Sequence, residues 1–335
     1  MTARACILGC LGPQLSSEES AYLREADPWG FIIFARNIQT PNQVRRLTSD
    51  LRETVGRDAP ILIDQEGGRV ARFSAPHWRK WTPALEFSQA YGVNAEEAMY
   101  LRGRMIADDL HCVGIDVNCA PMLDLANADS HHVILNRCYG YEAETVAVNG
   151  RALANGQLDG GVLSVIKHIP GHGRANLDSH FDLPKIDTSL TDLSATDFEP
   201  FKRLNDLPMA MTAHITYAAL DSDTCATLSP KVISTIRKDI GFGGLLMTDD
   251  LSMRALGGTF EDRTEDALAA GCDIILHCNG KRDEMDSILI NTPKLSGLSA
   301  IRASAALDQR VAPKIFDRNA AEETLIKLLK EAANV

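Results

Sequence analysis

The sequence predicts an α/β fold in which eight parallel strands, each followed by helix, close into one (β/α)8 barrel over residues 1–335. Three observations support this single-domain prediction. Eight short apolar runs recur along the chain, and stretches with helical character separate nearly all of them, which is typical of a parallel sheet. No linker or low-complexity segment divides the 335 residues. Several runs end in polar residues, as strands do at the carboxyl face of a barrel.

The predicted strands are runs rich in apolar and β-branched residues that end in polar residues or glycine. In chain order they cover residues 5–11, 30–36, 60–64, 115–119, 161–166, 209–214, 244–249 and 272–277. Runs of this length suit buried strands that are covered on both faces.

Helix signals occupy the intervals between these runs. Thr40-Pro41 and Ser229-Pro230 each place a capping hydroxyl directly before a proline, the usual start of a helix. Helices are predicted to begin near Ser16 and to cover residues 40–55, 94–112, 145–158, 190–204, 229–240 and 261–270, followed by an amphipathic C-terminal helix over residues 319–333.

Composition narrows the class of protein. The net charge of −11, from 34 basic and 45 acidic residues, comes without a basic run, so nucleic acid is not an expected partner. Eight cysteines form no C-x-x-C pair, which favours buried thiols in a reducing compartment. Only about five apolar residues precede Cys10, fewer than a secretory segment needs. We therefore expect a cytoplasmic protein with no membrane partner, present as a monomer or a weak homodimer.

The densest polar motif follows the fifth run. Lys167-His-Ile-Pro-Gly-His-Gly173 continues to Asp178 and His180. These two residues share a face if the segment is extended, because they are two positions apart. The Asp178 carboxylate could then hold one imidazole nitrogen of His180 while the other points into a cleft, as in an oriented general base. A histidine-rich surface loop and a metal site are the alternatives.

Two other carboxylates follow apolar runs. Asp249 and Asp250 end the seventh run, and strand alternation sends them to opposite sides. The pattern does not say which faces a cleft, and the other is expected to cap a turn. Asp64 ends the third run beside two glycines, where the backbone can approach a ligand. Its alternative role is a salt bridge to Arg69 or Arg72.

Other histidines and tryptophans have plainer interpretations. His214 and His277 are expected to be rim histidines with satisfied hydrogen bonds. His131-His132 has no evident third ligand, so no metal site is predicted there. Trp78 and Trp81 could stack on a sugar, although core packing explains them equally well.

The polar residues of the strand ends, together with two nearby arginines, suit a polyhydroxylated ligand. Hydroxyl groups need charged donors and charged acceptors, which form the stronger hydrogen bonds. Cations around Asp249 would also keep it ionised, as a nucleophile requires. The full set is Asp64, Arg72, Arg137, Lys167, His168 and Asp249.

Five motifs stand in order along the chain: Asp64-Gln-Glu-Gly-Gly-Arg-Val70, Asn136-Arg137, Lys167-His-Ile-Pro-Gly-His-Gly173, Asp178-Ser-His180 and Thr248-Asp-Asp-Leu-Ser-Met253. With them the chain resembles, over nearly its whole length, the family 3 glycoside hydrolases, and specifically the bacterial β-N-acetylglucosaminidases of peptidoglycan recycling. The departures are Ile169, where phenylalanine is usual, and Arg174-Ala-Asn176, which replaces a more polar stretch.

The resemblance implies the role of each matching residue. It makes Asp249 the nucleophile, His180 the acid/base and Asp178 the partner of His180. It gives the grip on the terminal sugar to Asp64, Arg72, Arg137, Lys167 and His168. It also implies a cytoplasmic barrel without a cofactor or a catalytic metal.

The implied reaction is retaining hydrolysis through a covalent glycosyl-enzyme. The implied substrate is N-acetylglucosamine linked to anhydro-N-acetylmuramic acid in peptide-bearing cell-wall fragments. A phosphorylase is one alternative, because a neutral histidine base repels phosphate less than a carboxylate does. A metal-dependent barrel hydrolase would need a His-x-His pair after the first strand, which residues 9–12 do not supply. A non-catalytic sugar-binding barrel would not need both Asp249 and the Asp178/His180 pair.

Overall fold

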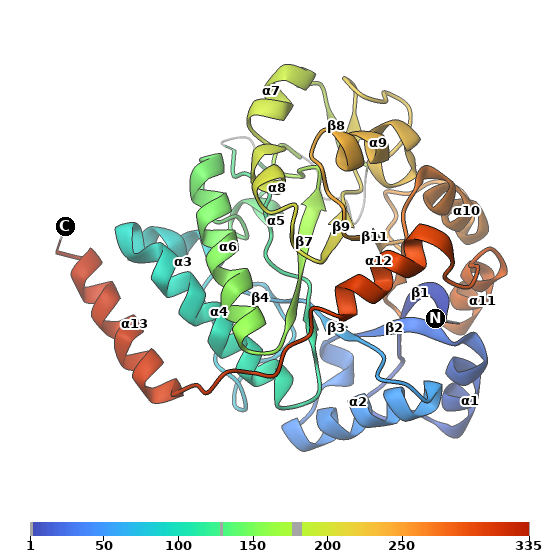
Figure 1. The fold of residues 1–335 in the computed structure, drawn as a ribbon, viewed down its shortest axis with the longest axis horizontal. Coiled ribbons are helices and arrows are strands. Elements are labelled where there is room, and N and C mark those ends of the chain that lie inside the picture. Colours follow the sequence, from blue (N-terminus) through green and yellow to red (C-terminus); the bar gives the residue numbers. More distant parts are fainter. Residues whose placement is uncertain (1–2, 128–129, 176–182, 335) are drawn as a thin grey trace.

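The computed structural model describes residues 3–127, 130–175 and 183–334, in which eight parallel strands close into a barrel (Figure 1). The order around the barrel is β1-β12-β11-β9-β7-β6-β3-β2. These strands are β1 Arg4–Gly9, β2 Pro28–Ile33, β3 Ile61–Ile63, β6 Val117–Asn118, β7 Leu163–Ile169, β9 Met209–Thr212, β11 Leu245–Asp250 and β12 Ile274–His277. Each of the eight apolar runs overlaps one of them, so the predicted fold class is confirmed.

Helices surround the barrel (Figure 1). They are α1 Ser17–Ala26, α2 Pro41–Val55, α3 Ala84–Tyr91, α4 Ala95–His111, α5 His132–Leu135, α6 Ala143–Asp159, α7 Leu190–Ala195, α8 Glu199–Arg203, α9 Pro230–Lys238, α10 Phe260–Ala270, α11 Arg282–Ile290, α12 Gly297–Leu307 and α13 Arg318–Ala332. Short 3-10 turns cover Ala35–Asn37, Gly92–Asn94 and Ala226–Leu228. The predicted caps are present, because the Thr40 and Ser229 hydroxyls accept hydrogen bonds from the backbone of Gln43 and Val232.

The prediction of one helix over residues 190–204 is wrong. The structure has two helices there, α7 and α8, with Pro200 in the first turn of α8. A proline has no N–H and clashes with the preceding turn, so it is tolerated at the start of a helix but not in its interior. Helices α3, α11 and α12 lie in segments for which we predicted no element.

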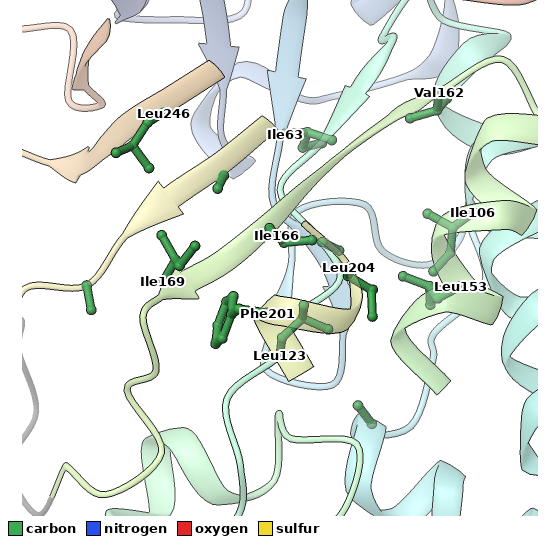
Figure 2. Packing of buried hydrophobic residues seen from close by; sticks show 14 of the residues in the cluster. Ile63, Ile106, Leu123, Leu153, Val162, Ile166, Ile169, Phe201, Leu204 and Leu246 are labelled. Carbon is green, nitrogen blue, oxygen red and sulfur yellow. The ribbon is translucent and has the colours of Figure 1, made fainter. Parts of the chain in front are cut away.

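Strand alternation divides the apolar core into two layers. Leu62, Val165 and Met247 belong to a cluster inside the barrel, whereas their neighbours on the strands face the surrounding helices. Figure 2 shows part of the outer layer, in which Ile166 and Leu246 on the strands belong to one cluster with helix residues such as Ile106 and Leu153. The barrel interior is therefore a packed floor rather than a pore.

Helix α12 closes the amino end of the barrel. Ala303 and Ala306 of this helix join the interior cluster, and the backbone N–H of Leu295, just before it, donates to the carbonyl of Ala3. The opposite, carboxyl end of the barrel is open and contains a cavity. Among the described helices, none has the length and apolar character needed to cross a bilayer.

Candidate active site

A cavity of about 130 Å³ opens at the carboxyl ends of the barrel strands, and all six predicted polar residues of the sugar-binding set line it. Alternation along the strands explains three of them. Asp64, Lys167 and Asp249 each lie two residues beyond an interior apolar residue, so they continue the inward face into the cavity. Residues that are far apart in the sequence are thereby brought together above one apolar floor.

Asp249 is the acidic group with the most unused bonding capacity in this cavity. Its Oδ1 accepts a hydrogen bond from the N–H of Asp250 at 2.8 Å, and within the described residues its Oδ2 has no partner. Burial alone would raise its pKa, but His214, His168 and Lys167 outweigh burial and hold the pKa below the ordinary value. An ionised carboxylate with a free oxygen is suited to nucleophilic attack.

Asp250 has its bonding capacity occupied. Its Oδ1 accepts from the backbone N–H groups of Ser252 at 3.0 Å and Cys278 at 3.2 Å, and its Oδ2 accepts from the Ser252 hydroxyl at 2.7 Å. The expected turn-capping neighbour of Asp249 is thus confirmed. Both residues nevertheless line the cavity, so alternation does not remove Asp250 from it as we expected.

A small hairpin places Arg72 against Asp64. Strands β4 (Gln65–Gly67) and β5 (Val70–Ala71) are joined by Gly68 and Arg69, and the φ angles of Gly67 and Gly68, 103° and 58°, suit glycine. Asp64 accepts from Arg72 Nη2 at 2.8 Å and from Lys167 Nζ at 2.9 Å. Despite burial, these two cations hold the pKa of Asp64 well below its ordinary value. The salt-bridge alternative for Asp64 and its place in the cavity are therefore both correct.

Glu66 is a site residue that we did not single out. Its carboxylate holds Arg137 through two bonds, of 2.8 and 2.9 Å, and also contacts Lys167 Nζ at 2.6 Å. Burial opposes ionisation, but Arg137 and Lys167 lower the pKa of Glu66 to about 2. The motif containing Glu66 was visible in the sequence, but its two partners lie 71 and 101 positions away (137 − 66 and 167 − 66). Glu66 therefore fixes two of the cations that line the cavity.

Asp124 is the second omission. It is fully buried after β6 and accepts from His168 Nδ1 at 2.7 Å. It also accepts from the backbone N–H groups of His168 and His172. His172 lines the cavity as well, and neither of its ring nitrogens has a partner in the described part of the chain. Burial and then His168 lower the pKa of His172 to about 4, so this imidazole is neutral near pH 7.

Asp178 and His180 lie outside the described residues, so their roles stay predictions. The described stem that leads to them is held by Arg174, whose Nε donates to the buried carboxylate of Asp197 at 2.7 Å. Gly173 packs so closely that a Cβ there would lie 1.9 Å from the carbonyl oxygen of Leu125. Glycine is therefore required at this position by close packing.

The rim histidines behave largely as expected. His214 is bonded at both nitrogens, to Thr227 Oγ1 at 2.8 Å and to the Asp250 carbonyl at 3.1 Å. His277 Nε2 pairs with Glu284 at 3.0 Å, whereas its Nδ1 has no partner among the described residues. Satisfied hydrogen bonding is thus confirmed for His214 and holds for one nitrogen of His277.

The two tryptophans belong to the core rather than to the cavity. Trp78 stacks on Phe73 with ring centroids 4.0 Å apart, and both tryptophans are buried in the outer core cluster. The rings of His131 and His132 lie 4.3 Å apart. Across the described ranges, no group of three or more His, Cys, Asp or Glu side chains is arranged to hold a metal ion.

Comparison with known proteins identifies the class of protein to which this fold and cavity belong. The model of the glycosyl hydrolase family 3 N-terminal domain matches residues 7–310, so the chain belongs to family 3 of the glycoside hydrolases, an enzyme family. Within that family it is similar to β-hexosaminidases. The one from Alkalilimnicola ehrlichii is 34% identical over 303 residues, which is 88% of this chain and 86% of the relative. The one from Pseudomonas aeruginosa PAO1 is 36% identical over 273 residues, 81% of each chain.

Solved structures agree with this placement. The native NagZ structure from Neisseria gonorrhoeae matches with a TM-score of 0.85 and 28% identity, covering 100% of this chain and 98% of that one. The same protein in complex with N-trifluoroacetyl-D-glucosamine matches with a TM-score of 0.84 at 28% identity over the same shares. The predicted family and the predicted enzyme class are confirmed.

Proposed function

We propose that this glycoside hydrolase is a retaining exo-β-N-acetylglucosaminidase that removes terminal non-reducing N-acetylglucosamine from cell-wall fragments. The observation that carries the proposal is Asp249, a carboxylate with a lowered pKa and a free oxygen in a cavity that three cationic side chains also line. The cavity ends on the packed apolar interior of the barrel, which includes Met211 and Leu276. A closed floor accepts the end of a saccharide chain rather than its middle.

The side chains around Asp249 supply the grip on the sugar. The Asp64 carboxylate can accept from sugar hydroxyls, while Arg72, Arg137 and Lys167 can donate to hydroxyl and carbonyl oxygens. Their mutual ion pairs hold them in place before the sugar arrives, which lowers the entropy lost on binding. The acetamido group of N-acetylglucosamine offers one acceptor and one donor to such a set.

The reaction proceeds in two displacements. The Asp249 carboxylate attacks the anomeric carbon, the bond to the leaving oxygen breaks, and that oxygen takes a proton from His180. Water then attacks the glycosyl ester, gives its proton to the now neutral His180, and releases Asp249. Asp178 favours the protonated imidazole of His180 in the first step. The last two assignments rest on the resemblance of Asp178-Ser-His180 to the family motif.

The proposed substrate is supported both by the cavity and by the family resemblance. N-acetylglucosamine linked to anhydro-N-acetylmuramic acid, on peptide-bearing fragments, is the substrate that the motifs imply. The ligand of the similar Neisseria gonorrhoeae protein, N-trifluoroacetyl-D-glucosamine, has the same sugar core. Release of free N-acetylglucosamine from isolated fragments, followed by chromatography, measures this activity. Repeating the assay with phosphate tests the phosphorylase alternative, because a phosphorylase would release the sugar 1-phosphate.

A mechanism-based label tests the nucleophile. A 2-fluoro-type glycoside with a good leaving group should form a stable ester on Asp249, because the fluorine slows both displacements while the good leaving group keeps the first one fast enough to occur. Digestion and mass spectrometry then locate the ester. Asp250 is the built-in control, since it touches the same cavity but has both oxygens bonded. A label on Asp250 would refute the assignment.

A second experiment tests the acid. Protonation of the leaving oxygen matters most for a poor leaving group, so His180→Ala should cripple natural disaccharides and spare activated aryl glycosides in the first step. The glycosyl-enzyme should then accumulate, because water lacks its base, and a burst of aglycone should appear. The measurement is the dependence of kcat/KM on the leaving-group pKa. If the variant shows no steeper dependence than the wild type, His180 is not the acid.

A further inference from the structure

Asp124 makes an unusual set of contacts for a residue outside the cavity. It is fully buried, and its two oxygens are used differently. Oδ2 lies 2.7 Å from Nδ1 of His168, and Oδ1 accepts from the backbone N–H of His172 at 2.5 Å. The backbone N–H of His168 is shared between the two oxygens, at 3.3 Å from Oδ1 and 3.4 Å from Oδ2. A single carboxylate thus holds the ring of one cavity histidine and the backbone of the next.

We propose that Asp124 is a positioning residue that fixes the tautomer of His168, with a proton on Nδ1 and Nε2 turned to the sugar. His168 lines the cavity, and its Nε2 makes no hydrogen bond to the described residues. The role rests on the proposed function, because the group that Nε2 meets is a hydroxyl of the bound sugar. The tautomer itself is a property of the free protein.

The physical reason is the inventory of donors and acceptors. An ionised carboxylate only accepts, so the His168 Nδ1 that faces Asp124 must carry a hydrogen. The pKa of Asp124 is lowered, since His168 and the N–H of His172 outweigh the effect of burial, and the group is therefore ionised near neutral pH. In its neutral form, His168 then presents a bare Nε2, which accepts from a sugar hydroxyl.

The substitution Asp124→Asn reverses this arrangement without changing the shape of the side chain. The backbone N–H of His172 on the Oδ1 side needs an acceptor, so it holds the amide oxygen there. The NH2 group is then forced to the Oδ2 position, where it faces His168 Nδ1 and requires a bare nitrogen. The proton of neutral His168 moves to Nε2, which becomes a donor where the sugar expects an acceptor.

The test combines a spectroscopic and a kinetic measurement. Nitrogen-15 spectra of the histidine rings should show the His168 proton on Nδ1 in the wild type and on Nε2 in Asp124→Asn. With an aryl N-acetylglucosaminide, the variant should lose about 10- to 100-fold in kcat/KM, mainly through a higher KM, because His168 grips the sugar. A proton that stays on Nδ1 in the variant, or an unchanged KM, would overturn the proposal.

Asp273→Asn is the matched control. Asp273 is equally buried and accepts from Arg237, Arg302 and a backbone N–H, but it lies at the amino end of β12, away from the cavity. Its variant should lose stability while leaving the tautomer of His168 and KM unchanged. If Asp124→Asn does not fold, the wild-type spectrum still decides, because a bare Nδ1 there refutes the proposal. Failure of the proposed function would instead appear as a wild type without hydrolase activity and with the expected tautomer.

Discussion

Buried ion pairs gather at both ends of the barrel. At the amino end, Asp273 lies between Arg237 at 2.7 Å and Arg302 at 3.0 Å, and Asp116 lies between Arg52 and Arg310. At the carboxyl end, Asp64 and Glu66 bind the cations of the cavity. The pairs at the two ends have similar lengths, so the presence of an ion pair does not by itself distinguish a site from a structural clamp.

The difference lies in unused bonding capacity. Both oxygens of Asp273 are occupied, by Arg237, Arg302, a backbone N–H and the Ser299 hydroxyl. At the carboxyl end, Asp249 Oδ2 and the nitrogens of His172 have no partner within the described ranges. The amino-end pairs hold α12 and the segment after it against the barrel, whereas the carboxyl-end pairs hold a cavity open to a ligand.

The largest effect is expected at Asp249. Asp249→Ala should lower kcat with an aryl N-acetylglucosaminide by about three orders of magnitude or more, because no other carboxylate among the described residues that line the cavity has a free oxygen to form the ester. Steady-state kinetics and circular dichroism measure activity and fold together. Addition of azide supplies an external nucleophile, so partial recovery with an inverted azide product would support the assignment.

Asp250→Ala provides the comparison within the same strand. It removes bonds to Ser252 and to the Cys278 backbone, so it should lower stability and reduce turnover much less. Similar losses of kcat in the two variants would mean that the pattern of free and occupied oxygens does not identify the nucleophile.

The next-largest effect is expected at Glu66, whose pKa is shifted in the opposite direction to that of Asp116 at the amino end of the barrel. Glu66 has a pKa lowered to about 2 from 4.5, whereas burial raises the pKa of Asp116 despite Arg310 and Arg52. Glu66→Gln should destabilise the fold by about 3–5 kcal/mol at neutral pH, because it leaves buried cations without their anion. It should also raise KM, since Arg137 and Lys167 lose their anchor.

The pH dependence has opposite signs at the two ends. The folded pKa of Glu66 is below its unfolded value, so its contribution is present above pH 4.5 and is lost as the pH falls toward 2. The stability deficit of Glu66→Gln should therefore shrink on acidification. Asp116 has a raised folded pKa, so Asp116→Asn should gain relative stability as the pH rises above the ordinary aspartate value of 3.8. Urea unfolding between pH 3 and 7 measures both, and equal slopes would contradict the contrast.

Much of this architecture could be predicted because its signals are local. Alternation and strand ends located Asp64, Lys167 and Asp249, since each follows an apolar run directly. The caps at Thr40 and Ser229 also act within three residues. Strand alternation could not decide between Asp249 and Asp250 as the functional carboxylate. Only the bonds from Ser252 and Cys278 show that the oxygens of Asp250 are occupied.

The residues that were missed depend on distant contacts. Asp124 is separated by 44 positions from His168, and Glu66 by 71 from Arg137. Glu66 stands two positions from Asp64, but nothing in the neighbourhood of either missed residue indicates its distant partner. Helix α12 was missed for a similar reason. Its small residues are explained by packing against the barrel interior and not by a strong local sequence pattern.

The smallest effect is expected from Arg102, which supports the carboxyl end from helix α4. Its guanidinium is fully buried, and Nη2 donates to the carbonyls of Glu66 at 2.7 Å and Thr82 at 3.0 Å. Arg102→Met removes the donor that fixes the backbone of Glu66 but keeps most of the volume. Burial lowers the pKa of Arg102 to about 10, and its Nε and Nη1 have no partner in the described ranges. Removal of this buried and partly unpaired charge should therefore offset much of the cost of the two lost hydrogen bonds, so stability should change little.

Arg104 on the same helix is the matched control. It is almost as buried, but its Nη2 donates to the carbonyl of Lys314 at 2.6 Å in the segment that leads to α13. Arg102→Met should lower kcat/KM about three- to tenfold with little change in the urea midpoint, whereas Arg104→Met should lower the midpoint and leave kcat/KM unchanged. The reasoning is that Glu66 transmits a small backbone shift to Arg137 and Lys167, and no such connection runs from Lys314. Equal kinetic losses in the two variants would show that α4 acts on the cavity through general packing and not through the Glu66 carbonyl.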